Sequence, residues 1–196
     1  MATEGISRRD ILRTLAVGAA AGSVLQVIPA EAAAYVHQAV RAEKSAVTKY
    51  TPKYFSAPQY AALTALCDAI IPKDDRSGGA VEAGAPEFID LLTSENLAFQ
   101  LRLGGGLMWL DNFCLDRYTN LYVACTPAQQ KEVLDAIAFH ANAKKDPTLS
   151  QGIAFFALLR NLTCDAFYTS KIGIEDLQYI GNTSVREFPG CSPIPD

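Results

Sequence analysis

The amino-acid sequence predicts an all-α protein: a compact helical domain, preceded by an N-terminal export signal and followed by an irregular C-terminal tail. Apolar residues recur at helical spacing through most of the chain, whereas strand-like alternation and β-hairpin signals are absent from the sequence. Of the 196 residues, 49% are hydrophobic and 19% are charged, so the chain can bury a core of its own. The net charge of -4 gives no electrostatic reason to bind nucleic acid or anionic lipid.

Residues 1–32 have the order of a twin-arginine export signal. Arg8 and Arg9 precede a Gly- and Ala-rich apolar segment that ends in small residues, and this order is typical of such signals. The predicted cleavage site follows Ala32, with Ala30 and Ala32 as its small residues. The alternative is an uncleaved signal that anchors the protein, although a bilayer span needs about 20 apolar residues. We therefore expect a periplasmic protein.

Residues 33–55 are predicted to form a lead-in helix and a linker, and residues 56–196 to form the helical domain. The first helix of this domain begins after Ser56, a good N-cap, and ends before Pro72, which cannot continue a helix. A polar, Gly-rich loop over 73–79 follows it.

The rest of the domain is predicted to be helical, with breaks. The three glycines at 104–106 are expected to interrupt a helix, and residues 144–147 are expected to form a loop. Thr126, with Gln129 three residues later, predicts a capped helix. Residues 153–168 are apolar on nearly all sides, which predicts a central helix.

Five cysteines are present, and an odd number leaves at least one free or paired with another chain. On one continuous helix, Cys114 and Cys125 would lie about 16 Å apart along the axis, too far for a disulfide. Cys67 and Cys114 both lie on apolar stripes and are expected to be small buried hydrophobic residues, and Cys164 lies in the predicted central helix. Cys191 lies in a Pro/Gly-rich tail, where we expect an interchain or tail-pinning disulfide.

No catalytic, cofactor-binding or metal-binding set is predicted. The two histidines, His37 and His140, have no second ligand at a metal-binding spacing. Asp74 and Asp75, with Glu82 further on, lack the spacing of a calcium loop. The alternative is an independent exported enzyme in which Asp74, Asp75 or His140 contributes to a site that the linear sequence does not reveal.

The C-terminal half carries more aromatic residues than a single small core can readily bury. Tyr168, Tyr179, Asn182 and Phe188 are the predicted partner interface, because tyrosines and proline-rich segments are common at protein interfaces. A tail that wraps around its own domain is the alternative.

Several segments, taken in order, resemble the gluconate 2-dehydrogenase subunit 3 family. The first is Ile70-Ile71-Pro72-Lys73-Asp74-Asp75, and the strongest is Phe155-Phe156-x-Leu158-Leu159-Arg160-x-Leu162-Thr163. The other segments span 78–80, 83–90, 106–111, 121–134, 167–173 and 176–182. Together with the signal, the resemblance covers nearly the whole chain.

The resemblance implies a non-catalytic small subunit of a periplasmic or membrane-associated sugar dehydrogenase of the gluconate 2-dehydrogenase or glucoside 3-dehydrogenase type. In such complexes a large flavoprotein of the glucose–methanol–choline type holds FAD, and a multihaem cytochrome subunit holds haem c. The small subunit, which holds no cofactor, is expected to support export, folding and stability of the flavoprotein. A stand-alone periplasmic helical binding protein is the alternative.

Overall fold

The computed structural model describes residues 28–46 and 50–181, and all regular secondary structure in these residues is helical. The predicted all-α fold is therefore confirmed. The longer helices are α2 (Ala30–Ala46), α3 (Ala57–Ile70), α4 (Ala85–Ser94), α6 (Gly105–Tyr118), α7 (Pro127–Ile137) and α9 (Ser150–Tyr168). The shorter segments are α5 (Leu97–Phe99), η1 (Gln100–Gly104), η2 (Tyr122–Ala124), α8 (Asn142–Lys145), η3 (Pro147–Leu149) and α10 (Lys171–Asp176).

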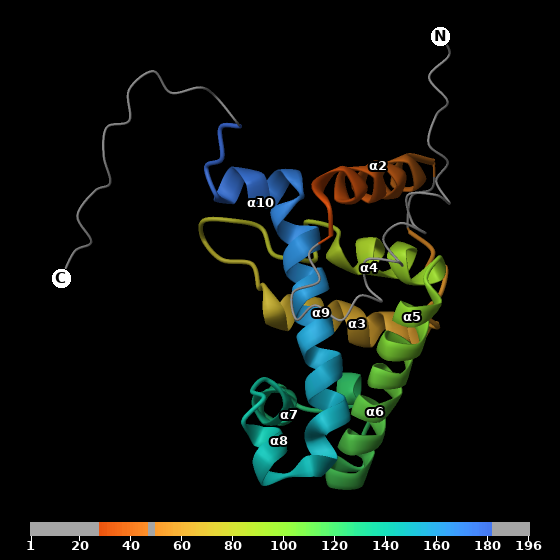
Figure 1. Ribbon diagram of the computed structural model, residues 1–196, viewed down its shortest axis with the longest axis vertical. Helices are drawn as coiled ribbons and strands as arrows, with labels where there is room; N and C mark the ends of the chain where they lie inside the picture. The colour runs from red at the N-terminus through yellow and green to blue at the C-terminus, as the bar shows by residue number, and fades with distance from the viewer. Residues whose placement is uncertain (1–27, 47–49, 182–196) are drawn as a thin grey trace, which may run out of the picture.

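Helix α9 lies at the centre of the domain, as its apolar sequence predicts. It runs along the long axis of the molecule, and α3, α4, α6 and α7 pack against it (Figure 1). Its large apolar side chains are buried: Ile153, Phe155, Phe156, Leu158, Leu159, Leu162 and Phe167. Since full burial of one such side chain contributes about 1.5–3 kcal/mol, this helix supplies much of the hydrophobic stabilisation. No helix in the described part of the chain is both long and apolar enough to cross a membrane.

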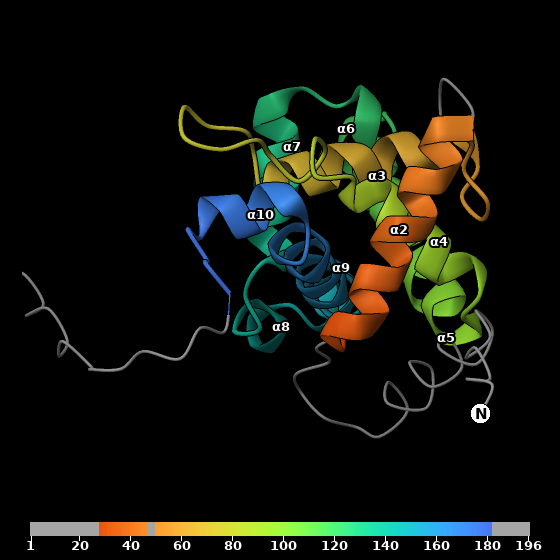
Figure 2. The same ribbon diagram turned by 90° about the horizontal axis from the view of Figure 1, so that it is seen from above.

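The lead-in helix is packed into the core of the domain. Helix α2 crosses one end of the molecule beside α4 (Figure 2), and it buries Ala33, Val36 and Val40. This helix begins earlier than the predicted residue 33, because its first turn also packs inward. The described residues of the predicted lead-in helix and linker thus contribute directly to the hydrophobic core.

The predicted cleavage site lies in the first turn of α2. Ala30 begins the helix, and Ala32 is only 5% exposed. Just before the helix, the backbone N–H of Ile28 donates a hydrogen bond to Asp165 Oδ2 on α9 (3.2 Å). Cleavage after Ala32 would remove this contact, and the cleavage itself stays a prediction.

A buried carboxylate on α4 holds the linker between α2 and α3. Asp90 is 0% exposed. Its Oδ2 accepts hydrogen bonds from the Tyr50 hydroxyl (2.8 Å) and the Lys53 amide (2.6 Å). Its Oδ1 accepts from the amides of Tyr54 (3.1 Å) and Phe55 (3.0 Å). These four donors replace the water that the carboxylate loses on burial.

The two predicted helix caps are confirmed. The Ser56 amide donates to Gln59 Oε1 (3.1 Å) at the start of α3. At the start of α7, Thr126 Oγ1 accepts from the Gln129 amide (3.3 Å), and Gln129 Oε1 accepts from the Thr126 amide (2.9 Å). Each reciprocal arrangement is a capping box, which satisfies backbone groups that the helix leaves open.

The three glycines at 104–106 do not interrupt the helix, so this prediction was wrong. Segments α5, η1 and α6 follow one another without a break from Leu97 to Tyr118, with a π-helical turn in η1. Gly106 faces α9, and a Cβ added there would lie 2.0 Å from Phe155 Cδ2. Glycine at this position therefore allows α6 and α9 to pack closely.

Short helical turns occupy two further places. The predicted loop at 144–147 is largely covered by α8 and η3, and α10 is a helix that the apolar pattern did not indicate. The Ser170 hydroxyl caps α10 by accepting a hydrogen bond from the Gly173 amide (3.1 Å). Helices this short depend on caps and packing, which a periodic apolar pattern does not reveal.

Candidate partner-binding surfaces

The two histidines lie in separate places. His37 is buried on α2, where its Nε2 is 2.9 Å from Thr169 Oγ1 and its ring packs 4.9 Å from the Phe88 ring. His140 is exposed just beyond the end of α7. Throughout 28–46 and 50–181, no three His, Cys, Asp or Glu side chains are grouped to hold a metal ion. His37 instead joins α2 to the end of α9.

The position of His37 predicts a pH-dependent stability. Burial and, to a smaller extent, the positive charge of Arg41 lower the pKa of His37 below its usual 6.5. The unfolded chain therefore binds this proton more readily than the folded chain, so stability should fall as the pH drops below about 6.5 and level off below the lowered folded-state pKa. Melting temperatures between about pH 5 and pH 7.5 should change less for H37Q than for the wild type. Identical pH profiles would contradict this assignment.

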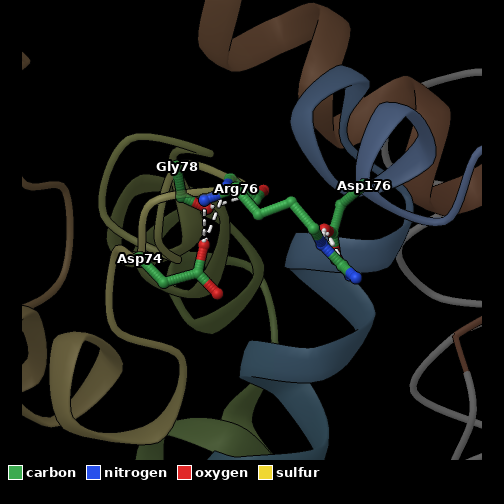
Figure 3. Close-up of polar contacts among 5 residues, drawn as sticks. Asp74, Arg76, Gly78 and Asp176 are labelled. Carbon is green, nitrogen blue, oxygen red and sulfur yellow. Dashed lines mark hydrogen bonds and ion pairs between the residues drawn. The ribbon is translucent and has the colours of Figure 1, made fainter.

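The acidic residues of the loop between α3 and α4 shape that loop. Asp74 Oδ1 accepts hydrogen bonds from the amides of Ser77 (2.7 Å) and Arg76 (2.9 Å) (Figure 3). These bonds, that of Ser77 first, hold the pKa of Asp74 below its usual value. Glu82 Oε2 accepts from the Gly79 amide (3.0 Å). Asp74 and Glu82 thus have backbone partners within the loop.

The same loop is joined to α10 by an ion pair. Arg76 donates from Nε (3.1 Å) and Nη2 (2.9 Å) to Asp176 Oδ1, as Figure 3 shows. A Cβ added at Gly78 would lie 3.5 Å from Ile172 Cγ2, which places α10 in contact with the loop. An exposed ion pair contributes little to stability, so this pair marks where the loop and α10 meet.

Exposed apolar side chains surround α10. We define the α10 surface as Tyr168, Ile174, Leu177, Tyr179 and Ile180, whose exposed fractions run from 38% to 84%. Tyr168 and Tyr179 are two of the four predicted interface residues. The other two, Asn182 and Phe188, lie outside the described residues, as do Arg8, Arg9 and Cys191.

A second apolar surface runs along the outer side of α5, η1 and α6. We define the outer stripe as Leu97, Leu101, Met108 and Leu115, which are 69%, 70%, 61% and 40% exposed. The apolar pattern predicted the inward positions of this helix, and the exposed outer positions were not predicted. The spacing of seven residues from Leu101 to Met108 and again to Leu115 was the available signal.

Gly105 leaves open space on the outer stripe. It follows Leu101 by four residues and precedes Met108 by three, so it lies between them on the helix. A Cβ added at Gly105 would meet no atom within 4 Å. Glycine inside a helix costs about 0.5–1 kcal/mol relative to alanine. In the described chain, no neighbouring group explains why this position is glycine instead of alanine.

A family model described as gluconate 2-dehydrogenase subunit 3 matches residues 57–190. The chain belongs to this family. No curated protein and no solved structure matches the chain at a significant level. The name of the family assigns its members to an enzyme complex that has other gluconate 2-dehydrogenase subunits.

In this subunit 3 protein, two segments of the matched region meet in space. The loop that follows Ile70-Ile71-Pro72 carries Arg76, and the segment that follows α9 carries Asp176. Their ion pair joins residues 100 positions apart in the sequence. Both segments lie within the matched region, and they meet beside the α10 surface.

The subunit 3 chain also brings Cys114 and Cys125 together. The separation expected on one continuous helix does not apply, because α6 ends at Tyr118 and the chain turns back. The thiols of the two cysteines are within hydrogen-bonding contact of each other. The structure joins none of Cys67, Cys114, Cys125 and Cys164 in a disulfide.

Proposed function

We propose that this chain is the non-catalytic accessory subunit of a periplasmic FAD-dependent sugar dehydrogenase, of the gluconate 2-dehydrogenase or glucoside 3-dehydrogenase type. Its partner is a large flavoprotein of the glucose–methanol–choline type, which holds FAD, and a multihaem cytochrome subunit holds haem c. The observation that carries this proposal is the outer stripe: four large apolar side chains exposed along one helix. Such exposed patches mark interaction sites.

The outer stripe suits a folded protein partner. Burial of its leucines and methionine against an apolar surface would release water from all four side chains. Gly105 has room around it, so a partner's backbone could approach the helix closely there. The partner surface is therefore an apolar face of the folded flavoprotein, and the α10 surface adds tyrosines to the interface.

An accessory subunit of this kind needs no chemistry of its own. A chain that binds only the folded flavoprotein raises the stability of that flavoprotein by mass action, by about 2.7 kcal/mol when its concentration is 100 times the dissociation constant. Stabilisation of the folded partner would also favour retention of its FAD.

Substitutions on the two surfaces test the proposed interface. Wild-type chain carrying an affinity tag, co-expressed with its flavoprotein, should retain the flavoprotein on the affinity resin. L101D and Y168D each place a charge within the interface and should reduce the retained flavoprotein at least tenfold, about 1.4 kcal/mol. F139D is the matched control, because Phe139 is also exposed (65% compared with 70% for Leu101) and lies on neither surface.

L101D and F139D should also leave the melting temperature of the isolated chain nearly unchanged, since both sites are exposed. Equal retention of the flavoprotein by all four proteins would contradict the interface. A wild-type chain that retains no flavoprotein would favour the stand-alone binding protein.

The export role rests on Arg8 and Arg9. R8K/R9K should leave the complex assembled but strand the flavoprotein activity in the cytoplasm, because the paired arginines are the recognition feature of the twin-arginine route. Sugar oxidation with an artificial electron acceptor, measured in the cytoplasmic and periplasmic fractions, gives the distribution. Normal periplasmic activity in the double variant would contradict the export role.

A further inference from the structure

The turn between α6 and α7 brings two distant cysteines into contact. Helix α6 carries Cys114 and ends at Tyr118, after which Thr119 adopts a left-handed conformation (φ 58°). The chain then returns through η2 to Cys125, whose thiol lies beside that of Cys114 and donates a hydrogen bond to the Asn120 carbonyl (3.9 Å). Cys114 is 0% exposed and Cys125 is 6% exposed.

Other contacts fix this turn independently of the cysteines. The Tyr122 amide donates to Asp111 Oδ1 on α6 (3.1 Å). Gln130 on α7 donates from Nε2 to the Tyr122 carbonyl (2.9 Å), and Tyr122 itself is only 1% exposed. The backbone on both sides of the thiol pair is therefore held in place, so a covalent bond between the sulfurs needs little rearrangement.

Cys67 has a different environment. Its Sγ lies 3.6 Å from Thr163 Oγ1 in the core, where the thiol is 0% exposed. Burial raises the pKa of Cys67 to about 12, as it does that of Cys114, so the two differ in position: the Cys67 thiol contacts a threonine and that of Cys114 a second cysteine. Cys67 therefore behaves as a small buried hydrophobic residue that contacts a hydroxyl group.

We propose that Cys114 and Cys125 form an intrachain disulfide after export, a proposal that rests on the periplasmic location given above. The oxidant is a disulfide of a periplasmic thiol–disulfide oxidoreductase. Cys125, the more exposed of the pair, attacks that disulfide and displaces one of its thiols. Cys114 then attacks the mixed disulfide and displaces the second thiol. Two protein thiols and one oxidant disulfide become one protein disulfide and two oxidant thiols.

The disulfide would covalently close the segment 114–125 at the base of α7. It restricts the unfolded chain, and for a closed loop of this size the melting temperature should rise by about 5–10 °C. The five cysteines would then comprise one disulfide pair and three others. Cys191, in the tail, would remain able to form an interchain or tail-pinning disulfide.

The test uses the full purified chain, refolded in a glutathione redox buffer or in a reducing buffer. After denaturation in acid and alkylation, peptide mass analysis should show Cys114 and Cys125 blocked from alkylation only in the oxidised sample, joined as one peptide pair. The oxidised wild type should melt about 5–10 °C above the reduced protein. C164S should keep this shift, whereas C114S/C125S should lose it.

Two results would overturn the disulfide: both thiols remaining alkylatable after oxidative refolding, or Cys114 or Cys125 found joined to another cysteine. Because the first comparison uses only the wild-type chain, a folding failure of C114S/C125S would not affect it. Retention of the flavoprotein by tagged wild-type chain is measured separately. Failure of the disulfide therefore leaves the accessory-subunit proposal intact.

Discussion

D90A should lower the free energy of unfolding by about 3–5 kcal/mol, because it removes the shared acceptor of four hydrogen-bond donors, and each donor left buried and unsatisfied costs about 1–3 kcal/mol. Alanine would leave the Tyr50 hydroxyl and the amides of Lys53, Tyr54 and Phe55 without their acceptor. The linker would then separate from α4. Urea denaturation of the purified chain, followed by circular dichroism, measures the loss.

D68A is the matched control for D90A. Asp68 is an exposed carboxylate on α3, and a surface substitution of this kind changes stability by no more than about 0.5 kcal/mol. D90N keeps the size of the side chain but has only one acceptor oxygen, so its stability should lie between those of D90A and the wild type. A loss for D90A no larger than that for D68A would show that the carboxylate does not hold the linker.

G106A should destabilise the protein by about 1–3 kcal/mol, the usual cost of adding a methyl group to a packed core. The new Cβ would lie 2.0 Å from Phe155 Cδ2 and 2.7 Å from Phe155 Cβ. The Phe155 side chain is itself buried on the central helix, so α6 and α9 would have to move apart. The same denaturation experiment reports the change.

Gly105, the neighbouring residue, supplies a control for which the free energy of unfolding should change in the opposite direction. G105A adds its methyl group in open space and removes backbone freedom from the unfolded chain, so it should stabilise the protein by about 0.5–1 kcal/mol. Two adjacent glycines in one helix would then respond in opposite directions. Destabilisation by G105A as large as that by G106A would show that helix geometry, rather than contact with Phe155, requires both glycines.

The helices and their caps could be predicted because their signals are local. The amides of Ser56 and Thr126 each donate to a glutamine side chain three residues later. The apolar run at 153–168 can be stable only where it is covered on all sides. The glycines at 104–106 were misjudged because the role of Gly106 depends on Phe155, which lies about fifty residues away. The helix propensity of a residue carries no information about such a distant contact.

The candidate surfaces were predicted only in part, for similar reasons. Tyr168 and Tyr179 were identified as surplus aromatics, and both are exposed in the structure. The outer stripe was missed because its leucines share a helix with core residues, and an apolar pattern alone does not say which side is covered. The contact between Cys114 and Cys125 was missed because it depends on the chain reversal at Thr119.

The central claim is that this chain binds a flavoprotein and holds no redox centre. The most direct test is to co-purify the tagged chain with its flavoprotein, separate the two, and measure flavin, haem, metal and sugar oxidation with an artificial acceptor in each fraction. We predict that flavin and turnover are found only with the large subunit. Stoichiometric flavin, haem or metal on the isolated chain, or sugar oxidation by that chain alone, would contradict the claim.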